Sequence, residues 1–343
     1  MKTQILKINP ANIDTAEIRK AAQIIKKGDL VAFPTETVYG LGADALNAEA
    51  VAKIFAAKNR PLDDPLIVHI ADKQDIFKVA KEIYKITLDL IDKFWPGPLT
   101  LVLKKSEIIP EIVTAGLDTV AVRMPDHPVA LSFIKESQTP IAAPSANLFG
   151  RPSSTTVEHV IDDLDGRIDV ILDGGPSSIG VESTVLDLTQ RPLQILRPGG
   201  ISIEELRRLN RSIKIFKSDS QPRLSPGMYR RHYSPKAKLI LIEGSGSAQI
   251  DKIKELASEF KMQGYSFGIM VKEENKDRYS DFNVKSLGPG NDLTICAANL
   301  FLILRDFDRE GVDTIIAEGV KEEGLGLAIM DRLRKAVGRE DYV

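Results

Sequence analysis

The chain has 343 residues, which is enough for two domains that each bury a hydrophobic core. Its 46 basic and 48 acidic side chains leave a formal net charge of −2, so no global basic field is available to hold a nucleic acid. The single cysteine excludes a disulfide framework and a metal site built from several thiolates. The sequence shows no signal-like or membrane-spanning apolar run, and we expect a cytoplasmic protein without a membrane partner.

Residues 1–210 alternate short apolar runs with amphipathic helical patterns, a succession typical of α/β domains. A first helix is predicted where apolar residues recur at helical spacing before Gly28, and a second where Asn47 can cap an amphipathic segment. The last two predicted strands follow each other without a helix, so we predict a mixed twisted sheet with flanking helices. The apolar runs that predict strands are 30–33, 66–70, 99–103, 119–123, 140–143, 169–173, 183–189 and 193–197.

The alternation stops at residues 211–236, which are polar, basic and proline-bearing. We interpret this segment, with its motif SPGMYRRHYSP, as an interdomain linker that also acts as a lid. Residues 237–343 then resume the alternation, which predicts a smaller Rossmann-like α/β domain. Its strands are predicted at 239–243, 267–271 and 314–318, and its helices near 248–263 and 292–309.

The motif FPTETVYGLG at 33–42 places polar side chains just beyond a predicted strand, in the crevice where open α/β sheets bind ligands. Its polar residues are Thr35, Glu36, Thr37 and Tyr39, and we read Gly40 and Gly42 as turn residues. An ordinary strand-to-loop turn is rich in the same residue types, so the motif alone leaves both interpretations open.

Cationic side chains also stand at predicted element ends. Lys58 and Arg60 leave a helix just before a proline, where they suit a triphosphate or form a solvated basic cluster. Arg123 ends a buried strand and needs a partner, either a substrate carboxylate or a structural salt bridge. His69 lies within an apolar strand, where a lone histidine is more often a core residue than a catalyst.

Small polar residues form further clusters at strand ends. Ser145 and Asn147 offer a phosphate or ribose cradle, while Ser183 is expected to be exposed at the start of a strand and Arg197 ends another. The segment GSGSAQ at 244–249 follows a strand and opens a helix, but Gln249 replaces the third glycine of a dinucleotide fingerprint. A nicotinamide-dependent dehydrogenase is therefore a poor alternative.

Seven segments in order resemble the YrdC-like family: PTETVYGLG, KNRPLDDPLIVHI, WPGPLTLVL, VAVRMPDHP, APSAN, VEST and LRPG. The linker motif and the trailing α/β domain resemble its long form, the threonylcarbamoyl-AMP synthases. The resemblance implies a nucleotidyltransferase that makes L-threonylcarbamoyladenylate and pyrophosphate from L-threonine, bicarbonate and ATP, with Mg²⁺ accompanying the ATP. It also implies that the product passes to the machinery for tRNA threonylcarbamoyl transfer.

The resemblance carries the family's binding positions over to matching residues. It implies that threonine is bound by Thr37, His69, Arg123, Ala143 and Ser183. It implies that ATP is bound by Lys58, Arg60, Asp64, Thr119, Ser145, Asn147, Arg197 and Tyr233. Asp64 departs from the asparagine that is common in the family, so it would act through a divalent cation or turn away from the phosphates. No covalent nucleophile and no metal held by protein side chains is expected.

Two other functions compete with the one that the resemblance implies. An RNA-binding module without turnover is one alternative, which the net charge of −2 disfavours. A carbamoyltransferase-type maturation enzyme shares the catalytic domain, but such proteins carry cysteine-rich zinc modules that a single cysteine cannot form.

Overall fold

The computed structural model describes residues 2–216, 224, 225, 227, 229 and 231–338. The chain forms two compact units. The predicted linker at 211–236 lies partly outside the described residues. Within the described ranges, no helix combines the length and the apolar character needed to cross a membrane. The first unit comprises Met1–Phe149, Ser153–Ser178 and Glu182–Met228, and the second comprises Gly150–Pro152, Ile179–Val181 and Tyr229–Val343.

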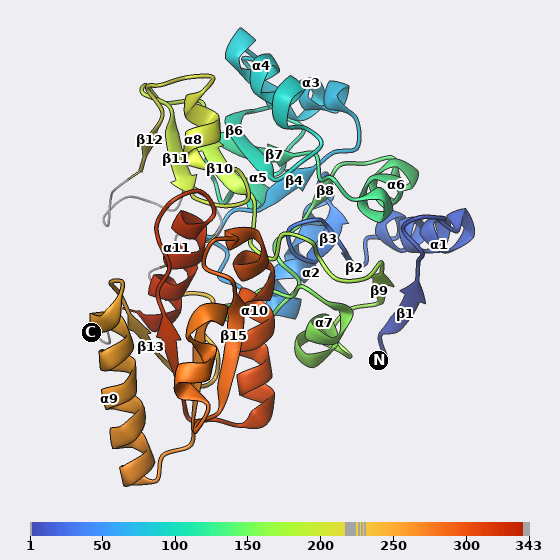
Figure 1. The fold of residues 1–343 in the computed structure, drawn as a ribbon. Coiled ribbons are helices and arrows are strands. Elements are labelled where there is room, and N and C mark those ends of the chain that lie inside the picture. The colour runs from blue at the N-terminus through green and yellow to red at the C-terminus, as the bar shows by residue number, and fades with distance from the viewer. Residues whose placement is uncertain (1, 217–223, 226, 228, 230, 339–343) are drawn as a thin grey trace. The chain divides into compact units, whose positions relative to one another are not determined.

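The first helix of the first unit is specified by its cap and its apolar stripe. The Asp14 carboxylate accepts a backbone N–H of the first turn at 2.8 Å, which starts α1 (Thr15–Lys26). The chain leaves the helix through Gly28, whose φ is 80°. The apolar face of α1 packs against α6 (Pro128–Ser137) and the sheet (Figure 1). The helix predicted before Gly28 is therefore confirmed.

Within the described residues, twelve strands form one sheet in this unit. They are β1 (Gln4–Lys7), β2 (Val31–Phe33), β3 (Gly40–Asp44), β4 (Ile67–His69), β5 (Ala80–Lys81), β6 (Leu99–Lys105), β7 (Thr119–Arg123), β8 (Ile141–Ala142), β9 (Val170–Asp173), β10 (Thr184–Asp187), β11 (Gln194–Arg197) and β12 (Lys214–Ile215). Their order is β1-β9-β2-β3-β8-β4-β7-β6-β10-β11-β12, and β5 pairs with β6. Parallel pairs such as β4 with β7 occur beside antiparallel pairs such as β6 with β7, which confirms a mixed sheet.

The other helices of this unit lie between the strands in the sequence (Figure 1). The N-terminus of α2 follows the prediction, because the Asn47 side chain accepts backbone N–H groups of the first turn. These helices are α2 (Ala48–Lys58), α3 (Ile76–Val79), α4 (Lys85–Phe94), α5 (Glu111–Thr114), α7 (Val157–Leu164) and α8 (Ile203–Arg207).

Strand β3 occupies the place where the sequence indicated a turn. It pairs antiparallel with β2, and Gly40 lies opposite Phe33. A Cβ atom added at Gly42 would lie 2.8 Å from Cγ2 of Ile141 and 3.0 Å from the ring of Phe33. The strand thus approaches its neighbours more closely than a side chain at Gly42 would allow. Close packing therefore explains the two glycines that the sequence analysis assigned to a turn.

The second unit contains a parallel sheet in the order β13-β16-β14-β15, made of β13 (Lys238–Ile242), β14 (Phe267–Lys272), β15 (Val284–Gly288) and β16 (Thr314–Glu318). Successive strand residues point to opposite faces. Ile269 accordingly joins the apolar cluster with α9 (Ser247–Gln263), whereas Gly268 lies against Phe307 of α10 (Leu293–Glu310). Helix α11 (Gly326–Val337) packs against β13 and α10. Helices on both faces confirm the predicted doubly wound domain, although β15 was not predicted.

Candidate active site

Arg123 ends β7 and is fixed by groups from two loops of the first unit. Its Nη2 lies 2.6 Å from Oε1 of Glu36, and the two side chains are 4% and 7% exposed. Its Nη1 donates to Oγ1 of Thr37 at 2.9 Å, and its Nε donates to the carbonyl of Gly97 at 3.3 Å. A guanidinium has five N–H donors, so two remain after one is assigned to each of these contacts with described residues. Arg123 can therefore hold a further carboxylate while it keeps its protein partners.

The loop that carries Glu36 and Thr37 is ordered by its own hydroxyl groups. Oγ1 of Thr35 accepts the N–H groups of Thr37 and Val38 at 3.2 and 3.3 Å, a turn typical of Ser and Thr. The Thr35 carbonyl in turn accepts the Ser177 hydroxyl at 2.8 Å. These bonds hold the polar residues that follow β2 against the end of β7.

Ser183 joins a second buried cluster just before β10. Its Oγ lies 2.7 Å from Oγ1 of Thr100, and Nη2 of Arg197 donates to the same Oγ at 3.2 Å. Ser183 is 1% exposed, so the expectation that it is exposed is wrong, and the neighbouring Thr184 is 0% exposed. The reason is that β10 lies inside the sheet, between β6 and β11, rather than at an edge. Ser183 and Arg197 are nevertheless brought together, as their shared place at strand ends suggested.

His69 ends β4, beside Arg123 in the parallel register. Its side chain is buried, its ring packs edge-on to Phe33 at 6.0 Å, and Nδ1 makes no hydrogen bond with a described residue. Burial, and after it the charge of Arg123, lowers the pKa of His69 to about 3. The imidazole is therefore neutral at physiological pH, and can donate or accept one hydrogen bond without adding a charge.

Lys58 is the last residue of α2, and Asn59 ends the helix in the left-handed conformation. The Lys58 ammonium donates to the backbone carbonyls of Ser145 and Asn147, and the side chain is almost completely buried. The interpretation as a solvated basic cluster is therefore wrong. The structure brings together three of the residues that the resemblance assigned to ATP.

Arg60 and Asp64 form a buried pair in the turn that follows α2. Nη2 of Arg60 lies 2.9 Å from Oδ2 of Asp64, with side chains 4% and 0% exposed. The same Nη2 donates to the carbonyl of Pro65 at 3.0 Å. The carboxylate of Asp64 thus has a cationic partner within the protein, which reduces the repulsion that an anion near phosphates would cause.

Three other predicted site residues make different contacts. Thr119 begins β7, about 13 Å along the strand from Arg123 at the ordinary rise per residue. Ala143 is buried and donates its N–H to the carbonyl of Ile67 at 2.9 Å. Tyr233 belongs to the second unit, where its ring stacks on Phe301 at 5.6 Å and lies 5.0 Å from the Arg332 guanidinium.

The glycine-rich segment 244–249 opens α9, as a dinucleotide fingerprint would. Gln249, however, is buried and donates from Nε2 to the carbonyls of Ile242 and Gly319, at 2.8 and 3.1 Å. The residue that replaces the third glycine therefore ties β13 to the segment after β16. This structural role agrees with the low expectation for a cofactor here.

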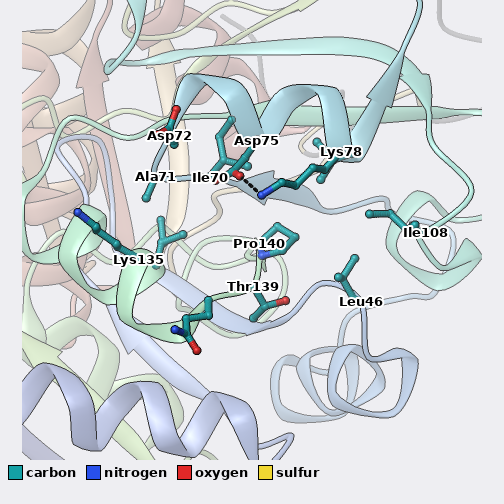
Figure 2. Close-up of a pocket in the computed structure, with 13 residues that line it drawn as sticks. Leu46, Ile70, Ala71, Asp72, Asp75, Lys78, Ile108, Lys135, Thr139 and Pro140 are labelled. Atoms are coloured by element: carbon teal, nitrogen blue, oxygen red, sulfur yellow. Dashed lines mark hydrogen bonds and ion pairs between the residues drawn. The ribbon is translucent and has the colours of Figure 1, made fainter.

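Figure 2 shows a separate cavity of about 490 Å³ in the first unit. None of the described residues that line it is a predicted site residue. Its charged side chains are two acidic and two basic, and Asp75 and Lys78 pair at 2.7 Å. This balance favours no particular charged ligand.

Two site residues were not assigned from the sequence, Glu36 and Thr100. Glu36 was noted as a polar group, and the need of Arg123 for an anionic partner was the signal that could have paired them. Thr100 lies within an apolar run, so the sequence gives no signal for its contact with Ser183.

Comparison with known proteins decides the family. Residues 23–199 match a family model described as telomere recombination, and residues 201–338 match that of the threonylcarbamoyl-AMP synthase C-terminal domain. The chain belongs to the threonylcarbamoyl-AMP synthase family. The resemblance stated from the motifs is thereby confirmed.

Members of this family match the chain over nearly its whole length. It is 50% identical over 330 residues to the threonylcarbamoyl-AMP synthase of Pyrococcus abyssi, with 95% of each chain covered. It is 49% identical over 326 residues to that of Bacillus subtilis, covering 94% of this chain and 93% of the relative. The crystal structure of P. abyssi Sua5 complexed with L-threonine has a TM-score of 0.92 at 49% identity and covers 98% of both chains.

Proposed function

We propose that this chain makes L-threonylcarbamoyladenylate and pyrophosphate from L-threonine, bicarbonate and ATP. The observation that carries the proposal is the near full-length identity of about half to proteins named for this activity. A relative with the same fold crystallised with L-threonine adds support for the amino acid. The adenylate then serves the machinery that modifies tRNA, and the reaction takes place in the cytoplasm.

The threonine end of the site is proposed at the Arg123 cluster. The α-carboxylate takes the remaining N–H donors of Arg123, while the hydroxyls of Thr37 and Ser183 offer further hydrogen bonds. His69 and the backbone at Ala143 complete this end, as the resemblance implies. The buried positions of these groups exclude water from the ligand and strengthen each contact.

The nucleotide end is proposed at Lys58, Arg60, Asp64, Ser145, Asn147 and Arg197, with Thr119 as a further contact. In the reaction the threonine amine adds to bicarbonate with loss of water, and an oxygen of the carbamate attacks the α-phosphorus as pyrophosphate leaves. Such a step needs alignment and charge neutralisation rather than a covalent nucleophile. Buried cations such as Lys58 and Arg197 suit that task. Mg²⁺ enters as part of the ATP substrate.

Mass spectrometry of the product tests this function. The full chain is mixed with ATP, bicarbonate, Mg²⁺ and either threonine or serine, and the adenylate and pyrophosphate are measured. We expect the threonyl product, and a slower serine reaction because one missing methyl group brings about 1–3 kcal/mol of discrimination. Salt-sensitive RNA binding without any adenylate would instead support the RNA-binding alternative.

A further inference from the structure

Glu36 is a buried residue of this site to which the proposed reaction gives no role. One of its oxygens, Oε1, lies 2.6 Å from Nη2 of Arg123. The other, Oε2, is also buried, and it accepts no hydrogen bond from a described residue. Buried carboxylate oxygens are usually hydrogen bonded in folded proteins. An acceptor that the described residues do not satisfy, next to a group that binds substrate, indicates a role toward that substrate.

The charges around Glu36 define what it does. His127 lies close enough for the charge of Glu36 to raise its pKa, but burial dominates and leaves the pKa of His127 below its ordinary value. Arg123 is therefore the lasting positive charge beside Glu36. Together the two side chains form a buried pair with no net charge, and both are less than a tenth exposed.

A neutral pair treats two kinds of ligand differently. A simple carboxylate on Arg123 would bring a second negative charge close to Glu36, and that repulsion offsets the attraction to Arg123. An α-amino acid carries an ammonium one carbon away from its carboxylate. Glu36 attracts the ammonium of such a zwitterion, while Arg123 attracts its carboxylate.

We propose that Glu36 is a specificity-determining residue, whose charge makes the Arg123 site select zwitterionic α-amino acids over carboxylates that lack an ammonium. The inference rests on the proposed function, because it takes the α-carboxylate of threonine to lie on Arg123. It deepens that function by assigning the recognition of the amine end to a residue for which the resemblance implied no threonine-binding role.

Calorimetry with two ligands tests the proposal. L-Threonine is compared with 2,3-dihydroxybutanoate, in which a hydroxyl replaces the ammonium, on the wild-type chain and on Glu36→Gln. We expect the wild type to bind threonine at least about 10-fold more tightly. In Glu36→Gln this ratio should fall about 10-fold, because the hydroxy acid gains affinity and threonine loses it.

The controls separate charge from structure. Glu36→Asp keeps the charge and should keep the preference for threonine, while Glu107→Gln, which removes a carboxylate that is 92% exposed, should change neither affinity. Equal changes for both ligands in Glu36→Gln would overturn the proposal, since Glu36 would then only support Arg123. If that variant does not fold, equal binding of both ligands by the wild type would overturn it too.

The binding readout also keeps the two claims apart. Threonine binding without any adenylate product would remove the proposed function and leave the selectivity intact. Adenylate formation, together with an unchanged ratio of the two affinities in Glu36→Gln, would support the proposed function and remove the proposed selectivity.

Discussion

Each unit of the chain buries a glutamate at the end of a strand or a few residues after it, and the two carboxylates differ in their hydrogen bonds. Glu318 ends β16 in the second unit and is 1% exposed. Its Oε2 accepts the N–H of Lys272 at 2.8 Å, and its Oε1 accepts from Asn275 at 2.7 Å and lies 2.9 Å from the Lys272 ammonium. Glu36 in the first unit has one ion contact, with Arg123, and one oxygen that no described residue satisfies.

The contrast separates a structural charge from a charge at a binding site. Position at a strand end is common to both glutamates, so position alone does not identify a site. The hydrogen bonds do identify it, because both carboxylate oxygens of Glu318 have partners in the protein, whereas Oε2 of Glu36 accepts no hydrogen bond from a described residue. Gln249 fits the structural side of this contrast, since its amide ties two segments of the second unit together.

The largest expected effect is on stability, and it comes from the second unit. Glu318→Ala should lower the free energy of unfolding by about 3 kcal/mol, because it breaks a buried ion pair and leaves two donors without an acceptor. Chemical denaturation measures the loss. The threonine and ATP KM values of the folded variant should stay at the wild-type level, and a change in either would end the description of Glu318 as structural.

The next largest effect is expected on substrate binding, at Arg123, the ion-pair partner of Glu36. Arg123→Ala should raise the threonine KM roughly 10- to 150-fold, because a charged hydrogen bond contributes about 1.5–3 kcal/mol, while the ATP KM changes little. Steady-state kinetics with each substrate varied in turn measures both. Arg123→Lys keeps the charge but loses the planar guanidinium, so its threonine KM should lie between those of the wild type and Arg123→Ala. Equal changes in both KM values would make Arg123 structural, like Glu318.

A smaller effect is expected at the nucleotide end. Lys58→Ala should weaken ATP binding about 10-fold, which corresponds to the lower end of the range for a hydrogen bond to a charged group. Calorimetry with ATP measures the change. Lys53→Ala is a matched control on the same helix, because that lysine forms an exposed pair with Asp29. If both variants bind ATP equally well, Lys58 serves only to hold the backbone of Ser145 and Asn147.

The sequence predicted the elements better than the contacts between them. Helical periodicity and capping located α1 and α2, and apolar runs located most strands, because those signals are local. The strand β3 was missed because Gly40 and Gly42 serve close packing rather than a turn. The need of Arg123 for an anionic partner could be predicted, but the choice of Glu36 could not, because the order of the sheet brings together residues that are far apart in the chain.

The smallest effect expected here is a dependence of stability on pH, and it tests whether His69 belongs with the unsatisfied groups of the first unit. The folded protein keeps His69 neutral down to its lowered pKa of about 3, whereas the unfolded chain takes up a proton near the ordinary value of 6.5. Unfolding therefore binds a proton between these values, so stability is highest above pH 6.5 and falls as the pH decreases toward 3.

The size of this effect follows from the same linkage. Between pH 7.5 and 5.5 the contribution of His69 to the free energy of unfolding should fall by about 1 kcal/mol. Denaturant unfolding of the wild type and of His69→Asn at both pH values isolates it, because all other titrating groups are common to the two proteins. If the difference in stability between the wild type and His69→Asn is the same at both pH values, His69 takes up a proton as readily in the folded protein as in the unfolded chain. That outcome would contradict the lowered pKa. A stability difference that shrinks toward low pH would show that the folded protein keeps His69 neutral, as its burial predicts.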